Sequence, residues 1–105
     1  MPRTVVRRKL ARTDIEQAAT YYFDTAGLAV AERFIAAVEA AVVHAATHPE
    51  AGSARYAQAL DRPGLRFWLV RGFPYLVFYR DAGDYLDVWR VLQGERDMPA
   101  WLREE

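Results

Sequence analysis

The 105-residue sequence predicts an α+β fold in which a helical hairpin packs on one face of a mainly antiparallel sheet. Two observations support this prediction. Apolar residues recur at helical spacing in two adjacent segments between Thr13 and Thr47. Three short apolar runs then follow one another between residues 65 and 92, as in a meander. The expected order is β-α-α-β-β-β, and the length fits a single domain over residues 1–105.

The first two elements predicted are a strand and a helix. The strand runs from Thr4 to Leu10, because β-branched residues begin this segment. The helix begins at Thr13, since Thr13 and Glu16 have the spacing of a capping box. Gly27 ends this helix. Its apolar stripe consists of Ile15, Ala18, Ala19, Tyr22 and Phe23.

A second helix is expected from Leu28 to Thr47, where apolar residues recur every three or four positions and alanines raise helix propensity. The short connection at Gly27 makes the two helices an antiparallel hairpin. Pro49 closes the second helix. Residues 50–64 are expected to form a long irregular connection, because they are rich in turn-forming residues.

Three strands are expected over Leu65–Arg71, Tyr75–Arg80 and Tyr85–Leu92, with turn-forming residues between them. Bulky side chains alternate on both faces of these strands, whereas one layer of helices covers only one face. We therefore expect the opposite face to expose aromatic and arginine side chains together, as a protein-binding surface. The alternative is that the long connection and the C-terminal tail cover that face.

Composition excludes several classes of protein. Fourteen basic and fourteen acidic residues give zero net charge, so we expect no direct DNA binding by this chain alone and no membrane association. No cysteine is present, which excludes disulfides and a cysteine nucleophile. No apolar run approaches the roughly 20 residues of a membrane span, and the N-terminus lacks the apolar core of a signal peptide. A cytoplasmic location is therefore expected.

The charge is nevertheless unevenly distributed. It is +5 in residues 1–12, −5 in 13–50, +4 in 51–80 and −4 in 81–105. A basic face can form if these blocks are separated in space, and the alternative is an ordinary mixed surface. Thirteen of the basic residues are arginines, which suit bidentate carboxylate or phosphate partners. On or beside the late strands lie Arg66, Arg71, Arg80, Arg90 and Arg96.

Catalytic and cofactor motifs are weak. His44 and His48 have the i, i+4 spacing of a shared metal site, but no third ligand is evident beyond Glu50. Histidines near a helix C-terminus are also favoured by the helix dipole. No phosphate-binding or dinucleotide fingerprint exists. We therefore predict no catalytic residue, metal or cofactor. Three aspartates lack the register of a calcium loop and are interpreted as a solvated turn: Asp81, Asp84 and Asp87.

Short segments along nearly the whole chain form an ordered set. They are Ala11–Ile15, Tyr21–Tyr22, Ala31–Phe34, His48–Gly52, Gly64–Trp68, Phe73–Arg80 and Arg90–Asp97. This set resembles the ParE/RelE toxin superfamily of bacterial type II toxin–antitoxin modules. The long helical hairpin and the segment Phe73–Arg80 are more similar to the ParE branch.

The resemblance implies the toxin of a plasmid-stabilisation module that poisons DNA gyrase by binding and is neutralised by a ParD-like antitoxin in a hetero-oligomer. The alternatives are a ribosome-dependent mRNA endoribonuclease of the RelE type and a non-toxic relic that only binds antitoxin. Many ParE-like chains carry histidine where this one has Gln93, and glutamine does not titrate near neutral pH. This departure argues against a catalytic role there and bears on toxicity.

Two groups of site residues follow. The residues expected to bind the antitoxin are Arg66, Trp68, Tyr79, Arg80, Trp89 and Arg90. The polar tail beyond the strands is expected to contact the target. The residues expected to act in toxicity there are Gln93, Arg96, Asp97 and Trp101.

Overall fold

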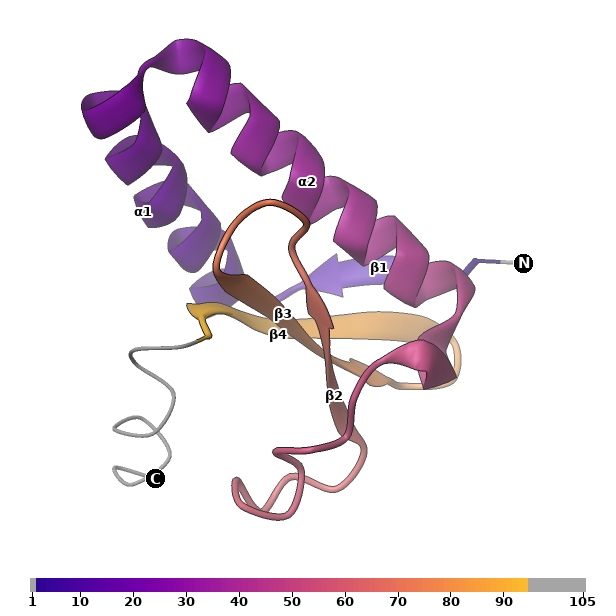
Figure 1. The fold of residues 1–105 in the computed structure, drawn as a ribbon. Coiled ribbons are helices and arrows are strands. Elements are labelled where there is room, and N and C mark those ends of the chain that lie inside the picture. The colour runs from indigo at the N-terminus through magenta and orange to yellow at the C-terminus, as the bar shows by residue number, and fades with distance from the viewer. Residues whose placement is uncertain (1, 95–105) are drawn as a thin grey trace.

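The computed structural model describes residues 2–94 and has the predicted order of elements (Figure 1). The elements are β1 (Thr4–Arg7), α1 (Lys9–Ala26), α2 (Leu28–Thr47), a 3-10 turn (Pro49–Ala51), β2 (Leu65–Leu69), β3 (Tyr75–Asp81) and β4 (Tyr85–Gln93). Both helices lie on one side of the sheet, which confirms the predicted α+β architecture. Neither helix in the described residues has the length and hydropathy needed to cross a membrane.

The sheet joins the two ends of the described chain. Its strand order is β1-β4-β3-β2, in which β2, β3 and β4 form antiparallel hairpins. The N-terminal strand β1 pairs with β4 in parallel, from Thr4 opposite Tyr85 to Arg7 opposite Val88. The sheet is therefore mainly antiparallel, as predicted, with one parallel edge.

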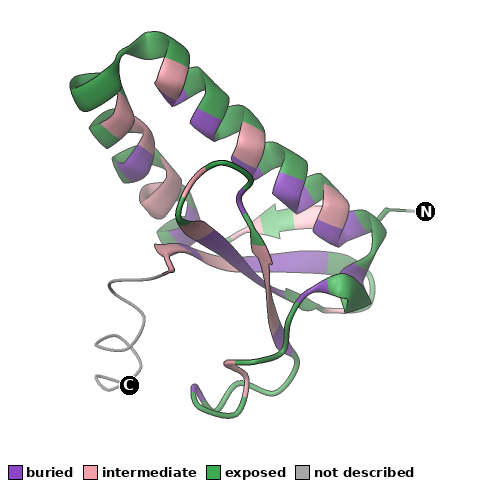
Figure 2. Cartoon of the chain, viewed as in Figure 1, coloured by how far each residue is buried: buried purple, intermediate pink, exposed green. Residues whose placement is uncertain are grey.

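The main core lies between α2 and the sheet. Phe34, Val38 and Val42 are fully buried along one side of α2, and Val77 and Val88 meet them from the sheet. Figure 2 shows these buried positions on the side of α2 that faces the strands. Alanines on the same side let the helix approach the sheet closely. They are Ala31, Ala41, Ala45 and Ala46.

The junction of the hairpin is a single glycine, as predicted. The Gly27 N–H donates to the Phe23 carbonyl at 3.0 Å and ends α1, while the Gly27 carbonyl accepts from Ala31 and starts α2. Gly27 has φ +94°, a conformation that side chains with a Cβ rarely adopt. The second helix also has its predicted bounds.

The start of the first helix differs from the prediction. α1 begins at Lys9, so Thr13 lies inside the helix and no capping box forms there. The strand β1 ends at Arg7 rather than Leu10. The reason is that the Arg8 N–H still donates to Val88 of β4, while the Arg8 carbonyl already accepts from Arg12. Tertiary pairing with β4 therefore fixes the boundary, rather than a local cap.

Asp14 connects the first helix to the sheet. Its carboxylate accepts two hydrogen bonds from the Arg90 guanidinium, at 2.8 and 3.0 Å, and a third from the Val91 N–H at 3.0 Å. β1 has ended at this level of the sheet, so Asp14 provides an acceptor for the edge of β4. The interaction is part-buried, which strengthens a charge-assisted hydrogen bond.

The β4 strand departs from simple alternation. Val88 lies opposite Tyr79, but Arg90 lies opposite Phe78, so Trp89 is an extra residue in a β-bulge. The alternation that the sequence predicted holds for Leu86, Val88 and Trp89, but beyond the bulge it is wrong because the bulge shifts the side chains that follow it. Beyond the bulge, Val91 joins the core on the helix side.

The face of the sheet away from the helices is also partly covered. A second apolar cluster forms there from Leu60, Leu65, Leu76 and Phe78, all buried, with Tyr56 packed against it. Leu60 and Tyr56 belong to the long connection between α2 and β2. The expectation that this face exposes its aromatic side chains is therefore wrong for the part that contains Phe78, where cover by the long connection, the alternative left open by the sequence, is correct.

Tyr79 fixes the start of the long connection. It is completely buried on the helix side, its hydroxyl donates to the Pro49 carbonyl at 2.9 Å, and it accepts from the Gly52 N–H at 3.0 Å. Arg66 donates to the Gly52 carbonyl at 2.7 Å. A Cβ on Gly52 would stand 2.2 Å from the Tyr79 hydroxyl oxygen, so this close approach requires glycine.

Replacing Asp14 with alanine should lower the free energy of unfolding by about 2–3 kcal/mol, because the acceptor shared by Arg90 and Val91 is lost. Urea unfolding followed by circular dichroism measures this change. Asp24→Ala, at an exposed acid on the same helix, should change stability by less than about 0.5 kcal/mol. Equal small effects of both substitutions would contradict the role of Asp14.

Tyr79→Phe should cost about 1–2 kcal/mol at neutral pH, because the buried Pro49 carbonyl and Gly52 N–H both lose their partner. Burial raises the pKa of Tyr79 above its ordinary value, so its contribution is complete below about pH 10 and is lost as the pH rises further. The variant should therefore lose less stability than the parent protein as the pH rises above about 10 in urea titrations. Tyr21→Phe, at an exposed tyrosine, should retain the parent protein's loss in this range.

Candidate partner-binding site

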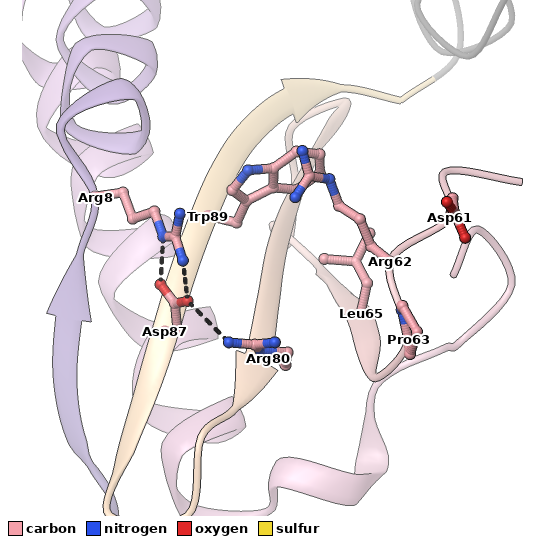
Figure 3. Close-up of a pocket in the computed structure, with 8 residues that line it drawn as sticks. All are labelled: Arg8, Asp61, Arg62, Pro63, Leu65, Arg80, Asp87 and Trp89. Carbon is pink, nitrogen blue, oxygen red and sulfur yellow. Dashed lines mark hydrogen bonds and ion pairs between the residues drawn. The ribbon is translucent and has the colours of Figure 1, made fainter. Parts of the chain in front are cut away.

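A hollow of about 200 Å³ opens on the face of the sheet away from the helices, beside the second apolar cluster. Its walls come from the end of β1, from β3 and β4, and from the long connection (Figure 3). We call it the arginine pocket. It is lined by Arg8, Asp61, Arg62, Pro63, Leu65, Arg80, Asp87 and Trp89.

The inner wall is an ion pair between β1 and β4. Arg8 donates to both carboxylate oxygens of Asp87, at 2.9 and 2.8 Å. Asp87 is only 4% exposed, so the interpretation of this residue as part of a solvated turn is wrong. The hydrogen bond to Asp87 raises the pKa of Arg8, which keeps the guanidinium charged. The pair therefore neutralises the buried carboxylate.

The remaining two arginines face the opening. Arg80 lies 4.0 Å from Asp87, and about half of its side chain is exposed. Arg62 lies over the ring of Trp89, with its guanidinium carbon 4.2 Å from the ring centroid, in a cation–π contact. Figure 3 shows the Arg62 side chain reaching from the long connection to the ring of Trp89.

The chemistry of this arrangement favours binding of an anion. Three arginines (Arg8, Arg62 and Arg80) face two aspartates (Asp61 and Asp87), so the lining carries one excess positive charge, while Trp89 and Leu65 supply apolar surface. Guanidinium groups bind carboxylates and phosphates but stay protonated, which makes them poor general bases. No histidine or tyrosine lines the pocket, and residues 2–94 contain no group of three or more potential metal ligands.

Comparison with known proteins identifies the family. A sequence model of the family described as "ParE toxin of type II toxin-antitoxin system, parDE" matches residues 5–98. The chain belongs to this ParE toxin family. A solved structure described as the chromosomal ParDE TA system from P. aeruginosa has the same fold, with a TM-score of 0.74 and 17% identity. That match covers 89% of this chain and 97% of the other chain. Comparison with curated proteins gave no match. The resemblance stated from the sequence is confirmed.

The ParE fold separates the six residues that the sequence predicted for antitoxin binding. Arg80 and Trp89 line the arginine pocket. Arg66 and Trp68 alternate with the pocket-side residues of β2 and point toward the helix side, where Trp68 stacks on His44 at 4.2 Å between centroids. Tyr79 is fully buried, so we leave it out of the proposed surface.

Arg90 and Gln93 lie together beside α1. Arg90 is paired with Asp14 and is only 21% exposed in its side chain, so it holds the fold together at this edge. Gln93 lines a shallow hollow with Tyr21 and Tyr75, away from the arginine pocket. The other residues predicted to act in toxicity lie outside the described residues: Arg96, Asp97 and Trp101.

Sequence reasoning missed Arg8 and Arg62 as site residues of this ParE-family chain. Arg8 comes to the pocket because β1 pairs in parallel with β4, which places it beside Asp87. Arg62 belongs to the long connection, which turns at Asp61 with a positive φ of 51° before it returns to β2. A long irregular segment gives no periodic signal of where its side chains lie, so no pattern in the sequence could have indicated Arg62.

Proposed function

We propose that this chain is the toxin of a ParDE-type module, that it poisons DNA gyrase by binding, and that a ParD-like antitoxin neutralises it. The match to the ParE toxin family over residues 5–98 carries the proposal. The arginine pocket adds a physical reason to expect an acidic protein partner, because two guanidinium groups lie at its mouth beside apolar surface.

The antitoxin is the partner that we propose for this pocket. A segment of such a partner that folds on binding would place a carboxylate between Arg62 and Arg80 and an apolar side chain against Trp89. Aromatic and arginine side chains are the types that contribute most to protein interfaces. The pocket opens to solvent, and Arg62, Arg80 and Trp89 lie together in its lining (Figure 3).

Binding explains these residues better than RNA cleavage. A ribosome-dependent nuclease needs groups that transfer protons and a strongly basic surface for docking on RNA. The arginine pocket has neither a histidine nor a tyrosine in its lining, and the whole chain has zero net charge. Because these features argue against RNA cleavage, we propose that the toxin acts on gyrase by binding to it.

The double substitution Arg62→Ala, Arg80→Ala should weaken binding of the cognate antitoxin by about 10- to 100-fold, because charge-assisted hydrogen bonds to a carboxylate are lost. Isothermal titration calorimetry on the purified toxin measures the dissociation constant. The weakening should shrink at high salt, since the lost contacts lie near the surface.

The matched control removes the same charge elsewhere. Arg12→Ala, Arg33→Ala changes two exposed arginines on α1 and α2 and should leave the dissociation constant within about twofold. An unchanged affinity of the folded Arg62→Ala, Arg80→Ala variant would exclude the pocket as the antitoxin site. That result would exclude only the location of the site, because the measured affinity of the parent chain would still show that it binds the antitoxin.

A further inference from the structure

Two histidines at the end of α2 have no role in the proposed function. His44 lies in the last turn of the helix and His48 is its C-terminal cap, and the His48 N–H donates to the His44 carbonyl at 2.9 Å. The two imidazoles therefore stand one helical turn apart on the same side. Their ring centroids are 5.2 Å apart, with an angle of 47° between the planes.

This separation fits a shared metal ion. Two imidazole nitrogens at about 2.0–2.1 Å from one ion, at a tetrahedral angle, place the ring centroids about 5 Å apart. Within residues 2–94, neither imidazole takes part in a side-chain hydrogen bond or ion pair, so their nitrogens are available. The i, i+4 spacing, which by itself led us to predict no metal, is thus accompanied by a ring separation that fits a shared ion.

Trp68 holds one of the two rings. His44 stacks on the Trp68 indole with centroids 4.2 Å apart and planes 26° apart. A metal ion binds an imidazole in the plane of the ring, through the nitrogen lone pair, whereas stacking uses the face. The stack therefore leaves the nitrogens of His44 accessible and limits the rotation of the ring, which reduces the entropy lost on metal binding.

The surroundings determine what kind of site this is. The histidines line a shallow, open hollow with Glu39, Val43 and Thr47. Glu39 is already paired with Arg7 of β1. Since the described residues contain no group of three potential ligands, a metal ion here would keep open coordination positions for water or a side chain of a bound partner.

We propose that His44 and His48 bind a divalent transition-metal ion of the Zn²⁺, Ni²⁺ or Cu²⁺ class. Imidazole is a preferred ligand for these ions, whereas Mg²⁺ and Ca²⁺ require oxygen ligands. The site lies on the helix side of the sheet, away from the arginine pocket on the opposite face. It therefore stands independently of the proposed toxin function.

Calorimetric titration of the untagged full chain with ZnCl₂ at neutral pH tests the proposal. We expect saturable binding of one ion per chain. His48→Ala and His44→Phe should each weaken this binding about tenfold or more, because a single imidazole is a poor anchor. His44→Phe keeps an aromatic ring for Trp68, so it separates loss of the ligand from loss of the stack.

The control is Thr47→Ala, which changes the same hollow without removing an imidazole and should leave zinc affinity unchanged. Circular dichroism checks that each variant is folded. Nuclear magnetic resonance should show that Zn²⁺ shifts the ring signals of both histidines in the parent chain. Absence of saturable binding, or binding that survives in both histidine variants, would overturn the proposal.

Discussion

The parallel pairing of β1 with β4 determines where the other elements of this ParE-family chain lie. These strands are far apart in sequence, yet Thr4–Arg7 extends the sheet beside Tyr85–Val88. The chain leaves this pairing directly into α1, so the direction of β1 sets the direction of the helix. Asp14 then holds α1 to β4 through Arg90 and Val91. With α1 fixed at one edge, the single-residue turn at Gly27 returns α2 across the sheet.

The same pairing creates the pocket on the opposite face. Arg8 follows β1 and forms the inner wall with Asp87, because the end of a parallel edge strand brings these side chains together. The bulge at Trp89 lets that side chain pack on the outer cluster and receive Arg62 from the long connection. A basic pocket thus forms on a chain of zero net charge, since arginines from three separate segments converge on it.

Local patterns were sufficient to predict much of this fold. The periodicity of Leu28–Thr47 and the glycine at position 27 gave correct bounds for α2, because these signals depend only on neighbouring residues. The start of α1 could not be predicted from local sequence, since hydrogen bonds to β4, rather than a helix cap, position Arg8 and Asp14. The positions of Arg62 and Arg90 depend on a loop path and a bulge, neither of which leaves a periodic trace. Arg80 and Trp89 were found because they lie on regular strands before or at the bulge.

Inhibition of gyrase is the most direct consequence of the proposed activity. The decisive measurement adds folded, antitoxin-free protein to gyrase and relaxed plasmid with ATP, and follows supercoiling and DNA cleavage on a gel. We expect loss of supercoiling or accumulation of cleaved plasmid, and recovery when the cognate antitoxin is added. Unaffected supercoiling at protein concentrations well above that of gyrase would contradict the proposed mechanism.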